Sequence, residues 1–171
     1  MLFRSYTAII GRMMAYLRGE LPSNYHITFS VKESTPYDIV KSVIGRGGNV
    51  AVVVDTYYWG PSHRYGLMPR YATFQTADGR DHFTIDVIDG DRHDIRTPDF
   101  DGRGKMIGLR LKAQSNKVKQ KARDLGFAKY FSRGGKEYST RFEMRQGGTI
   151  VITLPRLNAA ANPLPLVSSA R

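Results

Sequence analysis

The spacing of apolar residues predicts a helix and then a strand at the start of the chain. Over residues 2–18 the apolar side chains recur with a helical period and fill one broad face. Pro22 then ends this helix. Residues 25–32 alternate apolar and polar side chains, which predicts a strand.

A second helix and a central strand follow. Thr35 is a good N-cap, Pro36 suits the first helical position, and Asp38 completes an acidic variant of the capping box. We therefore expect a helix from there to about Gly45. Residues 50–58 form the most β-prone run of the chain and predict a central strand.

The middle of the chain predicts a hairpin and a long polar loop. Residues 70–76 and 81–88 read as paired strands, and Asp78-Gly79 between them is a strong turn signal. Residues 89–104 are rich in Asp and contain Gly and Pro, which is typical of a loop. Residues 105–113 form a short apolar and basic element whose type the pattern leaves open.

The last third predicts one basic helix and three strands. The helix covers residues 116–125, and its apolar stripe of Val118, Ala122 and Leu125 is expected to face inward. Strands are expected near the ranges 127–131, 137–145 and 149–154.

These elements predict an α+β fold with a mostly antiparallel sheet, two or three flanking helices and an extended C-terminal tail. We expect three parts: an amphipathic basic helix over 1–22, an α+β core over 23–156 and a Pro-containing tail over 157–171.

Charge changes this picture by suggesting a partner. The 171 residues carry a net charge of +11, and residues 103–171 hold a net +12 while residues 78–102 hold a net −5. A strong positive excess favours a polyanion as partner: nucleic acid, an anionic lipid surface or an acidic protein. The candidate polyanion-binding residues are Lys112, Lys117, Lys119, Lys121, Arg123, Lys129, Arg133 and Lys136.

Several kinds of chemistry are not expected. The chain has no cysteine, which excludes disulfides and thiolate metal sites. No enzyme motif, cofactor motif or metal-ligand spacing appears, so we expect no catalytic residue, no cofactor, no bound metal and no small-molecule substrate. No apolar run approaches the roughly 20 residues of a membrane span. The acidic loop is expected to be solvated, or to touch the basic region of a neighbouring subunit.

Two segments give the chain a resemblance to the matrix proteins of rhabdoviruses, especially the short ones of plant viruses. In the first, the strand Tyr25–Lys32 leads through Thr35-Pro36-Tyr37-Asp38-Ile39-Val40 into a helix and an apolar strand. In the second, the basic helix Asn116–Leu125 ends in Gly126-Phe127 and enters a hairpin across Gly134-Gly135. The resemblance spans roughly residues 25–145.

The resemblance implies a non-enzymatic virion protein that lies beneath the envelope, or at the inner face of a host membrane or in the host cytoplasm. Such a protein self-associates and bridges a nucleoprotein or RNA core to an anionic membrane. Arg4, Arg12 and Arg18 would then face the membrane. Residues that would hold subunits together in a homo-oligomer are Trp59, Pro163, Leu164, Pro165, Leu166 and Val167.

Two other functions stay open. One is a basic nucleic-acid-binding accessory protein of a phage or mobile element. The other is a metal-dependent nuclease that uses Asp99 and Asp101 of the acidic loop.

Overall fold

The chain folds around one mixed β-sheet. The computed structural model describes residues 3–55, 68–92, 95–112, 116–125, 129–130 and 148–157. The strands lie in the order β1-β2-β3-β6-β5-β4-β8, and β7 pairs with β3. Their bounds are β1 Phe3–Thr7, β2 Tyr25–Ser30, β3 Asn49–Asp55, β4 Tyr71–Thr76, β5 His82–Asp89, β6 Met106–Arg110, β7 Lys129–Tyr130 and β8 Thr149–Leu154.

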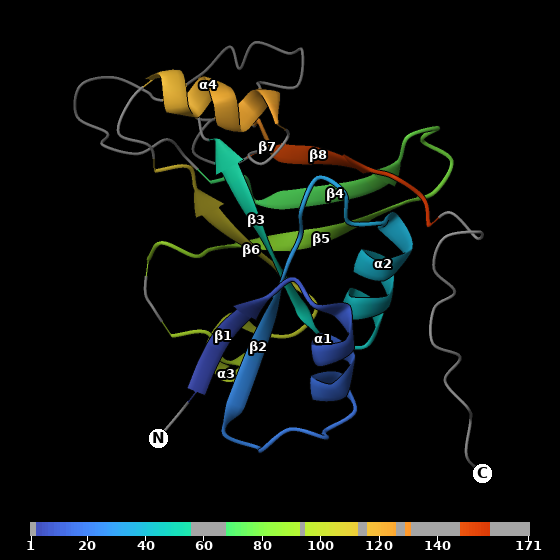
Figure 1. The fold of residues 1–171 in the computed structure, drawn as a ribbon, viewed down its shortest axis with the longest axis vertical. Helices are drawn as coiled ribbons and strands as arrows, with labels where there is room; N and C mark the ends of the chain where they lie inside the picture. Colours follow the sequence, from blue (N-terminus) through green and yellow to red (C-terminus); the bar gives the residue numbers. More distant parts are fainter. Residues whose placement is uncertain are drawn as a thin grey trace.

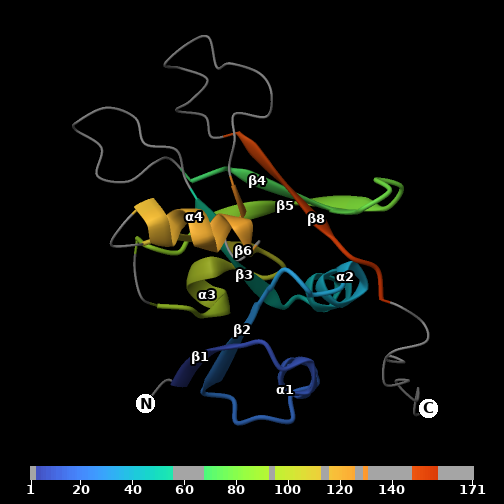
Figure 2. The same cartoon turned by 45° about the horizontal axis from the view of Figure 1, so that its top comes forward.

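Four helices are described around this sheet: α1 Ile10–Leu17, α2 Tyr37–Gly45, α3 Pro98–Asp101 and α4 Asn116–Asp124. Figures 1 and 2 show α1 and α2 together on one side of β2 and β3, with α3 on the other side. The same views show that β4, β5 and β8 cross the direction of β1 and β2, so the sheet is strongly twisted.

The predicted α+β class is confirmed, but a mostly antiparallel sheet is wrong. Among the described strand pairs, only β4 and β5 run antiparallel. The physical reason is the connection: α1 joins β1 to β2, and α2 joins β2 to β3. A helical crossover returns the chain to the same end of the sheet, so the next strand runs parallel.

The predicted N-terminal helix over 2–18 is wrong in its first half. Residues Phe3–Thr7 form the edge strand β1, in parallel register with Tyr25–Phe29 of β2. The helix starts only at Ile10. The N-terminal segment is therefore part of the sheet, where it pairs with β2 over five residues.

Other predicted elements are confirmed within a few residues: β2, α2, β3, the β4–β5 hairpin, α4 and β8. Residues 105–113, left open by the pattern, contain strand β6. The predicted capping differs, since Pro36 is the N-cap of α2 and no side chain caps it. Thr35 Oγ1 instead accepts the Lys32 amide at 2.8 Å, and Asp38 accepts the Leu157 amide at 3.1 Å.

The core lies between the sheet and the helices α1 and α2. Its members are apolar residues of these two helices and of the strands, among them Met13, Val40, Val50, Phe74 and Ile152, each fully buried.

Some predictions fall outside the described residues. These are Trp59, the strand over 137–145, the cations Arg133 and Lys136, and residues 158–171, which include Pro163, Leu164, Pro165, Leu166 and Val167.

Candidate functional site

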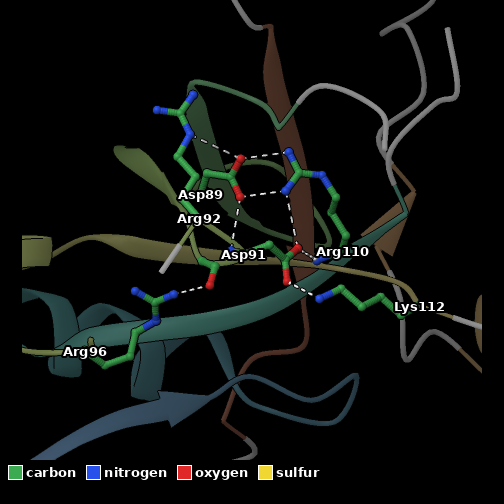
Figure 3. Close-up of polar contacts among 7 residues, drawn as sticks. Asp89, Asp91, Arg92, Arg96, Arg110 and Lys112 are labelled. Carbon is green, nitrogen blue, oxygen red and sulfur yellow. Dashed lines mark hydrogen bonds and ion pairs between the residues drawn. The ribbon is translucent and has the colours of Figure 1, made fainter. Parts of the chain in front are cut away.

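A network of charged side chains forms where strands β5 and β6 end. These strands are parallel neighbours, with Asp89 opposite Gly108, so Asp89 and Arg110 reach the same edge of the sheet. The Arg110 guanidinium donates to both oxygens of Asp89, at 2.6 Å and 2.7 Å (Figure 3). This two-point geometry is the strongest form of an Arg–carboxylate pair.

Asp91 extends the network toward helix α4. Its Oδ2 accepts the backbone amide of Arg110 at 2.9 Å, and its Oδ1 lies 2.8 Å from the Lys112 ammonium. The Asp91 amide in turn donates to Asp89 at 3.1 Å. Lys112 stands four positions before the first residue of α4, so the network lies close to that helix along the chain.

The cations, and not solvent, keep these carboxylates charged. Burial by itself raises the pKa of Asp89, but the hydrogen bonds and charge of Arg110 outweigh it and hold the pKa below its usual range. Burial acts in the same way on Asp91, whose pKa is lowered by Lys112 and by hydrogen bonds from Arg110. The hydrogen bond with Asp89 is the main cause that raises the pKa of Arg110.

A second ion pair, Arg96 with Asp101, is almost fully buried. The side chains are 6% and 2% exposed, and Arg96 Nη1 lies 3.2 Å from Asp101 Oδ1. Arg96 also donates to the carbonyl of Gly90 and to the hydroxyl of Tyr6, the latter at 3.3 Å. The loop after β5 is thereby fastened to the edge strand β1.

The prediction of a solvated acidic loop holds for Asp99, which is exposed, and is wrong for the carboxylates that are paired inside the chain. Asp89, Asp91 and Asp101 are paired inside their own chain, and neighbouring carboxylates behave alike: Asp86 pairs with Lys105, and Asp81 with Arg156 at 2.5 Å. The negative segment is largely neutralised within the fold. Some of the cations that pair with these carboxylates lie inside the acidic residues 78–102, like Arg92 and Arg96. Others follow this range in the sequence, like Lys105, Arg110 and Arg156.

The same pairing bears on the nuclease hypothesis. Asp101 is 3% exposed and held by Arg96, so it is not free to hold a metal ion on a substrate. Within the described residues, no three His, Asp or Glu side chains converge in a way that could bind a metal ion.

Helix α4 presents two lysines to solvent. Lys117 and Lys121 are one turn apart on the same side of the helix, and both are exposed. Neither has a carboxylate partner among the described residues, whereas the nearby Asp124 accepts a hydrogen bond from Gln120 at 2.7 Å. The expectation that Val118 and Leu125 face inward is wrong, because they are 55% and 60% exposed.

The remaining predicted cations divide into three groups. Lys112 is paired with Asp91, and Lys119 is half-buried. The side chains of Arg123, Lys129 and Arg4 lie outside the described residues. Two expected membrane-facing residues are occupied within the chain, because Arg12 donates to the Tyr25 hydroxyl at 2.5 Å and Arg18 pairs with Glu20 at 2.5 Å.

Helix α4 lies at the edge of the sheet where β3 and β6 end. It follows β6 directly in sequence, and β7 just after it pairs with Val54 and Asp55, the last residues of β3. Figure 1 shows α4 beyond the arrowheads of both strands. In open α/β sheets, ligands bind outside the carboxyl ends of the strands.

Sequence reasoning found the lysines of α4 but missed the charge network of Asp89, Asp91 and Arg110. The usable signal was position: Asp89 and Arg110 each end a β-prone run, and the ends of neighbouring parallel strands meet.

Comparison with known proteins corrects the predicted family. The model of one family, described as Gene product 88, a phage-type gene product family, matches residues 2–130. No curated protein and no solved structure shows a significant match to the chain. The resemblance to rhabdovirus matrix proteins is therefore wrong: it rested on the order of elements and on short segments, which unrelated α+β chains can share.

Proposed function

The chain belongs to the Gene product 88 family, and on that premise we propose that it is a phage-type accessory protein that binds nucleic acid through helix α4 without catalysing a reaction. The contacts are made to phosphates, so binding depends on charge and salt rather than on base sequence.

The pairing of charges carries this proposal. Among the described carboxylates of the acidic residues 78–102, six are paired with cations of the same chain, namely Asp78, Asp81, Asp86, Asp89, Asp91 and Asp101. Lys117 and Lys121 have no such partner among the described residues and stand exposed on one face of α4. Other exposed cations without a carboxylate partner among the described residues, such as Lys32, Lys41 and Arg103, are spread over other elements, whereas these two lysines stand one turn apart on one helix face.

The exposed apolar side chains of α4 support the same surface. Val118 and Leu125 lie beside the lysine face, with more than half of each residue exposed. A surface that combines cations with apolar groups can contact both the phosphates and the sugar edges of a nucleic acid.

A membrane is a weaker candidate for the polyanion. The role of bridging a nucleoprotein to a membrane was implied only by the resemblance to matrix proteins. In addition, Arg12 is hydrogen-bonded to the Tyr25 hydroxyl, and Arg18 is paired with Glu20. No helix among the described residues is long and apolar enough to cross a bilayer, a finding that does not bear on binding at a membrane surface.

The proposal is tested with a fluorescently labelled 30-base-pair DNA duplex and the same sequence as RNA, by anisotropy at about 0.1 M salt. Lys117→Gln with Lys121→Gln removes two phosphate contacts. Each contact releases about 0.9 counterion, so at this salt the pair should weaken binding about 50-fold.

A matched control removes two exposed cations from another helix. Lys41→Gln with Arg46→Gln lowers the net charge equally, but Lys41 lies in α2 and Arg46 is the C-cap of that helix, which both views place away from α4. We expect a loss of less than about threefold from this pair. Equal losses from the two pairs would show that net charge alone drives binding. Sedimentation of the protein with anionic liposomes, in the absence of binding to either duplex, would overturn the proposal in favour of a lipid surface.

A further inference from the structure

A cavity of about 370 Å³ lies beside the charge network, next to the edge strand β1. Ser5, Tyr6 and Thr28 line it from β1 and β2, and Leu109 lines it from β6. The loop after β5 closes it with Gly90, Asp91 and Arg96. Its size is at the lower end of the range for small-ligand sites, which suits a compact ligand.

The charges in the wall of this cavity are already compensated. Arg96 is paired with Asp101, and Asp91 is held by Arg110 and Lys112. An entering ligand therefore meets no unpaired buried charge, and it finds the hydroxyl group of Thr28 and the apolar side chain of Leu109, since the Ser5 hydroxyl is bonded to that of Tyr25. Such a lining accepts a flat, uncharged group with polar edges.

A cation and an aromatic ring adjoin the interior. The Lys112 ammonium lies 2.8 Å from the carboxylate of the lining residue Asp91, and 60% of the Lys112 side chain remains exposed. Tyr6 is 46% exposed, and its hydroxyl accepts a hydrogen bond from Arg96 that fixes the orientation of the ring. A fixed, exposed ring is a platform on which a base can stack.

We propose that this cavity binds one nucleotide, with its base against Tyr6 and Leu109 and its phosphate toward Lys112. The proposal rests on the proposed function, since it names the unpaired nucleotide as a second contact of the same nucleic-acid-binding protein. A free nucleotide offers the same chemistry as one residue of a strand, so this site could also bind a small molecule. The proposal therefore departs from the expectation of no small-molecule substrate.

The experiment measures binding of AMP, ribose 5-phosphate and a single-stranded DNA of ten adenines by the full chain. Saturation-transfer NMR detects the first two ligands, and anisotropy of a labelled strand detects the third. Tyr6→Ala removes the ring, and Tyr6→Phe keeps it while removing the hydroxyl. Because stacking of one base contributes a factor of about 5 to 150 in affinity, Tyr6→Ala should weaken AMP by at least about fivefold. Tyr6→Phe should weaken AMP less than Tyr6→Ala does, because the ring remains and only its hydrogen bond from Arg96 is lost.

Ribose 5-phosphate binding as tightly as AMP would overturn the proposal, and so would AMP binding that Tyr6→Ala leaves unchanged. A strand that binds more tightly than AMP and weakens with Tyr6→Ala supports the proposal and identifies the ligand as part of a strand. Equal affinities support it and identify a free nucleotide.

The α4 variant Lys117→Gln with Lys121→Gln should keep its affinity for AMP, because neither lysine lines the cavity. Failure of AMP binding in the natural chain, with duplex binding intact, therefore removes the nucleotide site and leaves the function of α4 standing.

Discussion

Replacing Arg110 by Met should destabilise the protein by about 3 kcal/mol at pH 7. The substitution keeps the length of the side chain but removes the cation that contacts both Asp89 and Asp91. Loss of one member of a buried ion pair costs about 3–5 kcal/mol. The side chains of Arg110, Asp89 and Asp91 are 12%, 16% and 18% exposed, and Lys112 still contacts Asp91, so the lower end applies.

The effect should depend on pH in a fixed direction. In the natural chain the pKa values of Asp89 and Asp91 are lowered, so their contribution to stability is complete above the ordinary carboxyl pKa of about 4. It is lost as the pH falls below that value. The difference between Arg110→Met and the natural chain should therefore shrink below about pH 4, because protonated carboxyls no longer need a cation.

Urea unfolding followed by circular dichroism at pH 7 and pH 3 measures the destabilisation by Arg110→Met and its decrease in acid. At pH 7 the destabilisation of about 3 kcal/mol corresponds to a fall in Tm of about 6–12 °C. Arg92→Met is the matched control, since Arg92 lies 3.7 Å from Asp89 with 81% of its side chain exposed. It should cost less than about 0.5 kcal/mol. A loss from Arg110→Met no larger than that of the control, or one that does not shrink in acid, would refute the reasoning.

Two further predictions concern the core. Tyr37 is 2% exposed, and its hydroxyl has no hydrogen-bond partner among the described residues. Tyr37→Phe should therefore leave the free energy of unfolding unchanged or raise it by about 1 kcal/mol. A clear decrease of this free energy in urea unfolding would show that the hydroxyl has a partner. Gly48→Ala would place a Cβ 2.6 Å from Met13 Cε and 2.9 Å from Val43 Cγ1, and should lower Tm by overpacking worth about 1–3 kcal/mol. Gly45→Ala has open space around it and should not lower Tm; equal shifts for the two glycines would contradict the packing argument.

Local elements could be predicted from the sequence where one pattern dominates. The alternation in β2, the turn residues Asp78-Gly79 and the β-branched run of β3 each allow one interpretation. Strand β1 was missed because its apolar residues also fit a helical period that continues into α1. The parallel sheet was accessible in principle, since a strand, a helix and a strand joined by short connections form a parallel unit.

The candidate site divides in the same way. The lysines of α4 could be predicted because an amphipathic basic helix is a local pattern. The network of Asp89, Asp91 and Arg110 could not, because its members are 19 to 21 positions apart and meet only through the pairing of β5 with β6. From composition alone, these aspartates were interpreted as a solvated negative patch. In the fold, Asp89 pairs with Arg110 and Asp91 with Lys112.

The salt dependence of duplex binding tests the central claim most directly. Each phosphate contact adds about 0.9 to the slope of log K against log salt concentration. Between 50 and 200 mM salt, the pair Lys117→Gln with Lys121→Gln should flatten this slope by about 1.8 relative to the natural chain. The α2 pair Lys41→Gln with Arg46→Gln should leave it unchanged. Identical slopes for the natural chain and the α4 pair would contradict the account.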